Sequence, residues 1–100
     1  MILGSVDLAA TTETLVFSVD QARTIQQISF ANRNAGHVLL RLWIVPRDTA
    51  KADKHIWVPD KNLAAKSVVL LFEHNIDLEQ GEQIWAYSDT ANVSVNVVGY

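Results

Sequence analysis

The sequence predicts an all-β domain, an antiparallel β-sandwich or jelly-roll of about eight short strands. Short apolar segments rich in β-branched and aromatic residues recur roughly every ten residues along the chain, which is typical of such folds. No segment of useful length has the apolar period of a helix, so the crossover helices that a parallel sheet needs are absent from the pattern. With 100 residues and 49% hydrophobic residues, the chain forms one domain, residues 1–100, with a full core.

Polar turn residues separate the predicted strands from one another. The clearest signal is at residues 32–36, where two asparagines and a glycine between two apolar runs predict a hairpin loop. Pro59 stops another strand, which indicates an edge position for that strand. Residues 46–54 are polar and predict an exposed loop, and residues 75–81 predict a loop whose apolar side chains turn inward. Strands are predicted at residues 4–10, 15–19, 23–32, 37–46, 55–58, 66–74, 82–88 and from residue 93 onward.

The third predicted strand, residues 23–32, contains one break in its alternating pattern. Ile28 and Phe30 share a face, whereas Ile25 has the opposite parity. Two interpretations follow from this pattern. Either Ile25 faces outward, or a β-bulge near residues 26–27 resets the register and brings Ile25 into the core.

The segment at residues 37–46 is the apolar centre of the predicted fold. It is apolar at nearly every position and closed by Pro46, and about ten residues are too few for a membrane span. A strand places alternate side chains on opposite faces. Because Arg41 belongs to one of the two sets, we expect that set to face outward. The inward set is then Val38, Leu40, Leu42 and Ile44, and the outward set is Leu39, Arg41, Trp43 and Val45.

The outward face of this strand is more apolar than a surface that contacts only water. In residues 66–74 the parity of Glu73 predicts that Val68, Leu70 and Phe72 face inward. In residues 82–88, we expect Ile84 and Ala86 to face the core. Apolar patches left on a surface mark sites of association. The predicted interface residues are Leu39, Arg41, Trp43, Val45, Trp57, Val69, Leu71, Trp85 and Tyr87.

The composition argues against several classes of protein. The net charge is −3 with eight Lys and Arg residues, and they form no basic patch of the kind that nucleic-acid-binding proteins carry. The chain has no cysteine, so neither a disulfide framework nor a thiolate metal site is expected. Its first residues lack the charged and apolar regions of a signal peptide, so the expected place of synthesis is the cytoplasm, with no membrane contact.

No motif for catalysis or for metal or phosphate binding occurs in the sequence. His37, His55 and His74 each lie at a predicted strand end, without a second ligand at a suitable spacing. The sequence has no nucleophile elbow and no glycine-rich phosphate loop. We therefore predict a protein that is not an enzyme and has no metal or cofactor. A small enzyme whose carboxylates meet only in space is the remaining alternative.

Three tryptophans in 100 residues leave three interpretations open. The aromatic side chains fill the core, or they form a protein–protein interface, since aromatic residues bury a large area at small entropic cost. In the third interpretation they form a stacking platform for carbohydrate.

The order of the segments resembles that of the small β-sandwich virion proteins of tailed bacteriophages. The resemblance spans residues 14–98 and depends on three motifs. They are Ile25-Gln26-Gln27-Ile28-Ser29-Phe30-Ala31-Asn32, then Leu42-Trp43-Ile44-Val45-Pro46, then Leu78-Glu79-Gln80-Gly81-Glu82-Gln83-Ile84. The charged loop at residues 47–54 departs from the glycine-rich loop that the family pattern has there.

This resemblance implies a structural subunit of a phage particle, made in the host cytoplasm and located in the virion. It implies a capsid decoration (cement) protein that forms a trimer or ring and docks on other virion proteins, such as the major capsid protein. A tail or neck component is an alternative, and so is a carbohydrate-binding module at a receptor-binding tip. The resemblance supplies no catalytic residues.

Overall fold

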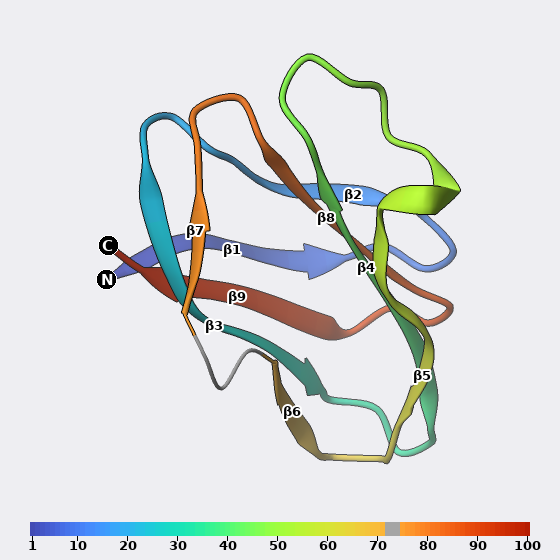
Figure 1. Cartoon of the computed structure of the whole chain (residues 1–100). Helices are drawn as coiled ribbons and strands as arrows, with labels where there is room; N and C mark the ends of the chain where they lie inside the picture. The colour runs from blue at the N-terminus through green and yellow to red at the C-terminus, as the bar shows by residue number, and fades with distance from the viewer. Residues whose placement is uncertain (72–74) are drawn as a thin grey trace.

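The computed structural model describes the backbone of residues 1–71 and 75–100, and the Leu71 side chain lies outside the described part. Two antiparallel sheets pack face to face (Figure 1). We refer to them as sheet A and sheet B. Sheet A has the order β1 (Ile2–Leu8), β9 (Val93–Gly99), β3 (Arg23–Asn32) and β6 (Val68–Leu71), and β7 (Ile76–Leu78) also pairs with β3. Sheet B has the order β2 (Thr14–Ser18), β8 (Gln83–Ser88), β4 (Val38–Val45) and β5 (Ile56–Leu63).

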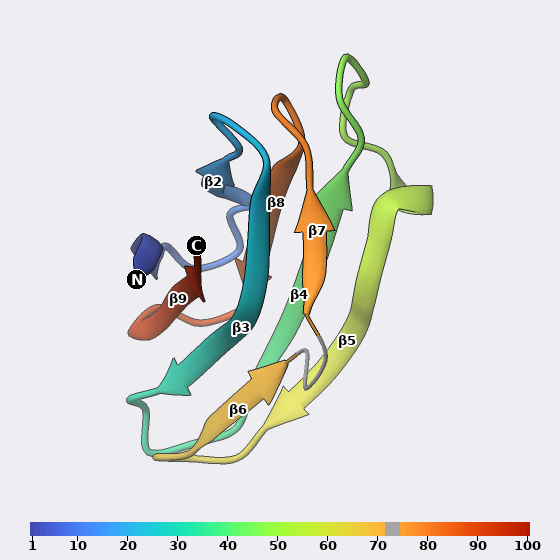
Figure 2. The ribbon, with the colours of Figure 1, turned by 60° about the vertical axis from the view of Figure 1, so that its left-hand side comes forward.

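The strand pairs nest inside one another along the chain, as in a jelly-roll. β1 pairs with β9, β2 with β8, β3 with both β6 and β7, and β4 with β5. The chain therefore resembles one long hairpin that is rolled over so that successive strand pairs join sheet A and sheet B in alternation. Figure 2 shows the two sheets from the side, with β5 and β6 bordering the same side of the sandwich. The predicted fold class is confirmed, and β7 is an additional short strand where a loop was expected.

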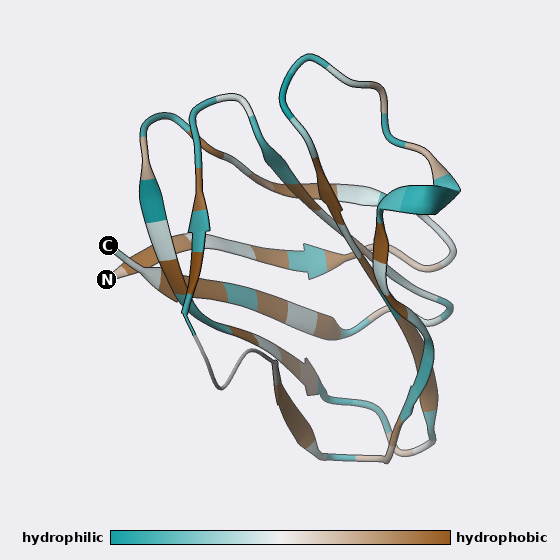
Figure 3. Ribbon diagram, in the orientation of Figure 1, coloured by the Kyte–Doolittle hydropathy of each residue, from teal (hydrophilic) through white to brown (hydrophobic). Residues whose placement is uncertain are grey.

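The core lies between the two sheets and contains the predicted inward faces of β4 and β8. Leu42 and Ile84 are completely buried, and Leu78 is tucked inward from β7 as predicted. The alternation of apolar and polar residues that produces this burial is visible along most strands in Figure 3. The buried cluster consists of Leu8, Val16, Val19, Ile25, Ile28, Phe30, Val38, Leu40, Leu42, Ile44, Leu63, Leu78, Ile84, Ala86, Val93, Val95 and Val97.

A β-bulge in β3 resolves the parity of Ile25. The pairing of β3 with β9 runs from Ile25 opposite Gly99 to Gln27 opposite Val98, with a register shift between them. Ile25 is 1% exposed and belongs to the core. Of the two interpretations of the sequence pattern, the bulge is confirmed. The extra residue of the bulge shifts the alternation, so that Ile25 faces the core together with Ile28 and Phe30 although its parity is opposite.

The turn after β3 does not close a hairpin, so that prediction is wrong. β3 lies in sheet A and β4 lies in sheet B, and the turn carries the chain from one sheet to the other. The buried amide of Asn32 donates hydrogen bonds to the carbonyls of Gly36 at 2.9 Å and Ala64 at 3.0 Å. Its Oδ1 accepts one from the backbone N–H of Asn34 at 2.9 Å. Asn32 therefore holds two crossing connections together, a role that a hairpin turn does not require.

Pro59 lies inside β5, which is longer than predicted. β5 is an edge strand of sheet B, as the proline indicated, because an edge strand leaves alternate backbone groups unpaired. Helical backbone is limited, within the described ranges, to one 3-10 turn at Asp53–His55. None of the helices found there is long and apolar enough to cross a membrane.

Candidate functional site

The outer face of sheet B carries most of the predicted interface residues. Trp43 lies opposite Trp85, and Arg41 lies opposite Tyr87, in the pairing of β4 with β8. Opposite residues in an antiparallel pair project from the same face, so these four side chains form a continuous block. We refer to these two cross-strand pairs as the aromatic block. Leu39 is half-buried nearby, on the same strand.

The expectation that Trp43 and Val45 are exposed is wrong. Trp43 is 2% exposed and Val45 is 0% exposed in the isolated chain. Arg41, Trp85 and Tyr87 are half-buried. Two of the candidates thus have almost no surface to offer to a partner, and Trp85 and Tyr87 keep part of theirs.

The loop between β4 and β5 is what encloses Trp43. The Lys51 ammonium group, carried by this loop, lies 4.4 Å from the centroid of the Trp43 ring and 5.8 Å from that of Trp85. It also forms an ion pair of 2.9 Å with Glu13 at the end preceding β2. The sequence predicted an exposed loop because the segment is polar. Residues 46–50 and 52–54 are exposed as predicted, whereas Lys51 is half-buried and its ammonium group lies over the rings and contacts Glu13.

The two indole N–H groups of the aromatic block differ in their surroundings. Trp85 Nε1 donates a hydrogen bond of 3.0 Å to Gln83 Oε1. Trp43 Nε1 is buried without a partner, the one such buried side-chain atom among the described residues. A buried donor without a partner destabilises the folded state. Of the two indole N–H groups, that of Trp43 therefore carries this energetic cost and that of Trp85 does not.

A second cation covers the other end of the aromatic block. The Arg41 guanidinium lies 4.8 Å from the centroid of the Tyr87 ring and forms a hydrogen-bonded ion pair with Asp60 on β5. The hydrogen bond to Asp60 raises the pKa of Arg41 above its ordinary value. Cations therefore lie over all three rings of the aromatic block, which leaves less of each ring for a sugar to stack on.

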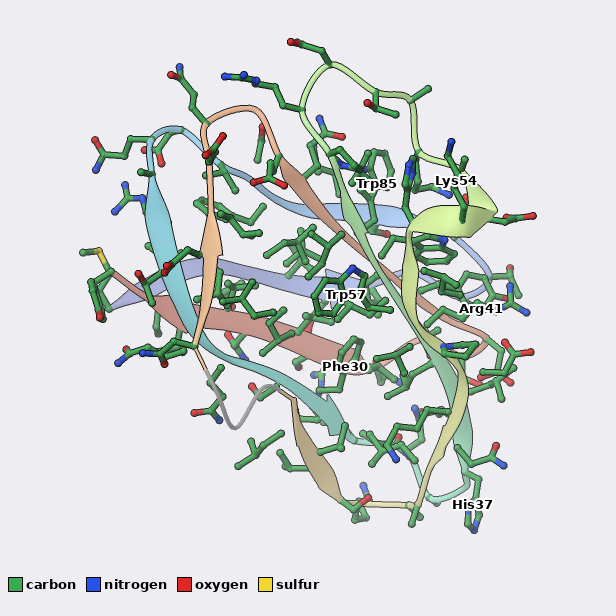
Figure 4. The ribbon with its side chains drawn as sticks, in the orientation of Figure 1. Phe30, His37, Arg41, Lys54, Trp57 and Trp85 are labelled. Atoms are coloured by element: carbon green, nitrogen blue, oxygen red, sulfur yellow. The ribbon has the colours of Figure 1, made fainter. Side chains whose placement is uncertain are left out.

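Trp57 is the exposed exception among these aromatic side chains. It is 52% exposed and lies on the edge strand β5. Figure 4 shows Trp57 and Arg41 on opposite sides of β5. The structure thus does not unite Trp57 with the aromatic block, contrary to its grouping in the predicted interface.

The parity of β6 is the reverse of the prediction. Val69 lies opposite Phe30 in the pairing with β3 and packs against the core, so its assignment to the outer face is wrong. Val68 and Leu70, predicted to be buried, are 60% and 59% exposed. The predicted roles of Leu71, Phe72 and His74 concern side chains outside the described part. The prediction placed Val68 and Leu70 inward because Glu73 was expected to face outward. In the structure the pairing of Val69 with Phe30 on β3 determines which side chains face the core.

The histidines and acidic residues of the described segments form no cluster of three that could hold a metal ion. His37 is exposed, as expected, whereas His55 is 9% exposed and its Nδ1 accepts a hydrogen bond of 3.0 Å from the backbone N–H of Ala52. That bond satisfies the imidazole within the β4–β5 loop. His55 therefore has a structural role, because its imidazole holds the end of the β4–β5 loop through this hydrogen bond.

An open hollow of about 460 Å³ lies over the paired ends of β3 and β7, beside Tyr100. Arg23 and Asp77 line it. Both are already bonded, Arg23 to both carboxylate oxygens of Asp20 at 3.0 Å and Asp77 to the Thr24 hydroxyl at 2.8 Å. Both of these side chains are therefore engaged in bonds within the chain.

The fold and surfaces define a jelly-roll β-sandwich with an aromatic block on sheet B and an exposed apolar pair on β6. Comparison of the chain with protein-family models, curated protein sequences and solved structures finds no match. The contacts described above are therefore the basis for any statement about function.

Proposed function

We propose that this chain is a non-enzymatic structural subunit that assembles with copies of itself. The observation that carries the proposal is the exposure of Val68 and Leu70, at 60% and 59%, on an edge strand that lacks charged residues. An apolar edge of this kind is a template for pairing with another chain, and monomeric proteins normally protect their edges with charges, proline or bulges.

The resemblance to small β-sandwich virion proteins of tailed bacteriophages supports a more specific form of the proposal. In this form the protein is a capsid decoration protein that docks on the major capsid protein, or else a tail or neck component. A jelly-roll is a fold that viral structural proteins use, among other classes, so the fold is compatible with this role.

Carbohydrate binding is the weaker candidate on the geometry. A sugar-stacking platform needs exposed ring faces, and Lys51 and Arg41 lie over rings of the aromatic block. Trp43, at the centre of that block, is buried. Titration with sugars, followed by tryptophan fluorescence, is expected to give no saturable change, and a saturable change would favour this alternative.

Sedimentation equilibrium over a wide concentration range tests the proposal. The proposal expects a reversible oligomer whose fraction rises with concentration. A single monomeric species up to about 1 mM would overturn self-association, because even a weak specific contact is populated at that concentration. Rebinding of the purified protein to phage heads that lack it tests the virion role separately, and a failure there would leave self-association intact.

A further inference from the structure

Five strands of the described part have an unpaired edge, β1, β6 and β7 in sheet A and β2 and β5 in sheet B, and they are not equally protected against pairing with another chain. β1 has a register shift between Ile2 and Gly4, and β2 has one between Leu15 and Phe17. β5 contains Pro59 followed by a charged pair, Asp60 and Lys61. Bulges, prolines and charges are the devices by which native proteins prevent edge-to-edge association. β7 is only three residues long and contains the charged residue Asp77. β1, β2, β5 and β7 therefore each carry at least one such device.

β6 carries none of these devices. Its sequence is Val68-Val69-Leu70-Leu71, and its pairing with β3 runs without a register shift from Ala31 to Ile28. β6 ends the strand order of sheet A, and no strand in the described ranges pairs with its outer edge. In Figure 3 β6 is coloured as hydrophobic throughout. A regular, uncharged and apolar edge is the arrangement that accepts a further strand.

Since the other edges are protected, the strand of this chain that best fits the edge of β6 is β6 itself. We infer that two copies of the chain associate through antiparallel pairing of their β6 strands about a two-fold axis. This inference rests on the proposed self-association and specifies its geometry. A two-fold contact uses the same surface on both copies, which is the commonest closed arrangement of soluble homo-oligomers. It differs from the trimer or ring that the resemblance implies.

The two-fold axis restricts the register of this pairing. Directly opposite residues of an antiparallel pair project from the same face. The two-fold axis exchanges the two β6 strands, so if residue i of one copy lies opposite residue j of the other, residue j of the first must lie opposite residue i of the second. A register centred on Val69 satisfies both conditions. It places Val68 of each copy opposite Leu70 of the other on the outer face, so that the two most exposed side chains of β6 cover each other. Each Val69 then meets its equivalent on the inner face and extends the apolar core across the contact.

The joined sheets A would form one continuous sheet through both copies. The contact involves only a short strand from each copy, so the area that it buries is small, and small interfaces are typically weak. We therefore expect a dimer that dissociates on dilution.

Cysteine cross-linking tests the register directly, because the natural chain contains no cysteine. Opposite residues in an antiparallel pair have Cα atoms about 4.5–5.5 Å apart, a separation that a disulfide spans. The double variant Val68→Cys/Leu70→Cys is expected to oxidise to a covalent dimer at least roughly tenfold faster than either single variant, in which equivalent thiols are not opposite. Ile2→Cys, 66% exposed on the other edge of sheet A, is the matched control.

A charged variant gives the second measurement. Val68→Lys/Leu70→Lys keeps the side chains exposed, and is expected to shift the wild-type dimer to monomer in sedimentation with an unchanged circular-dichroism spectrum. Ile2→Lys is expected to leave the dimer in place. Equal cross-linking of all cysteine variants, or an oligomer that survives the two lysines, would overturn the β6 contact while leaving self-association standing. A wild type that is monomeric at every concentration would overturn both.

Discussion

The Lys51 ammonium group lies 4.4 Å from the centroid of the Trp43 ring, and it covers a tryptophan that is buried although it belongs to the outward-facing set of β4. Glu13 holds the ammonium from the other side at 2.9 Å. The segment that precedes β2 therefore meets β4 and the loop that follows β4 at one point on the outer face of sheet B. The contact explains why an apolar strand face can exist there without a partner protein.

Lys51→Met tests the stabilising effect of this cation. The variant keeps most of the aliphatic side chain over the ring but removes the charge, so the cation–π contact and the ion pair with Glu13 are lost together. We expect a loss of about 1–2 kcal/mol in the free energy of unfolding, measured by urea denaturation. Lys54→Met, in the same loop at an exposed position, is the control and should change it by less than about 0.5 kcal/mol. Equal effects of both variants would show that Lys51 acts only through the net charge.

Substitutions of Trp43 separate core packing from association. Because Trp43 is buried within one chain, Trp43→Ala should lower the free energy of unfolding by about 3–5 kcal/mol. Trp43→Phe should cost clearly less, because it keeps an aromatic ring and removes the unpartnered Nε1 group. Denaturation is compared with sedimentation for both variants. Loss of assembly without loss of stability would contradict the burial of Trp43.

Asn32→Ala tests the connection between the two sheets. The substitution leaves the carbonyls of Gly36 and Ala64 without the amide that donates to them. We expect a loss of about 2–3 kcal/mol, because buried polar groups become unsatisfied. Asn62→Ala on the exposed part of β5 is the control, and it should be nearly neutral. The midpoint of thermal or chemical unfolding is the measurement, and a neutral Asn32→Ala would remove the structural role of this side chain.

Gly99 is packed too closely for a side chain. A Cβ atom at this position would lie 2.1 Å from the backbone oxygen of Thr24, at the bulge opposite Ile25. Gly99→Ala should therefore destabilise the protein by about 1–3 kcal/mol, since backbone must shift to accept the methyl group. Gly36→Ala, where the methyl group meets nothing within 4 Å, should be neutral or slightly stabilising. Hydrogen exchange of the amides in β3 and β9 should locate the effect of Gly99→Ala at the bulge.

The ion pair between Asp20 and Arg23 predicts a small pH dependence. The hydrogen bonds from Arg23 lower the pKa of Asp20 below its ordinary value of 3.8. A carboxyl with a lowered folded-state pKa stabilises the protein above its ordinary pKa, and this contribution is lost as the pH falls through the lowered value. Asp20→Asn should therefore cost a little stability at neutral pH and nothing in strong acid. The effect is small because the pair is exposed to solvent. Asp53→Asn is the control, and parallel stability–pH curves for Asp20→Asn and wild type would contradict the prediction.

Prediction of the fold from the sequence succeeded where burial follows a local pattern. The alternation in β4 and β8 predicted their inner faces correctly, because a strand with one buried face must repeat every two residues. The break at Ile25 left two interpretations open, and the structure confirms the one with a bulge. Trp43, Trp85 and Tyr87 were also assigned to the correct face of sheet B. The sequence could not predict that Lys51 would cover two of them, because the contact depends on where a polar loop folds back.

By itself, the sequence determined the all-β class, the positions of most strands and the inner face of β4, because these follow from the spacing of apolar residues along the chain. Only the tertiary structure decided which sheet each strand joins, the parity of β6 and the burial of Trp43. In β6 both alternating sets of side chains are apolar, so the sequence pattern does not show which set faces the core. The pairing of Val69 with Phe30 determines that Val69 does. Contacts between segments distant in the sequence decided these features, since their energies depend on positions that only the folded chain defines.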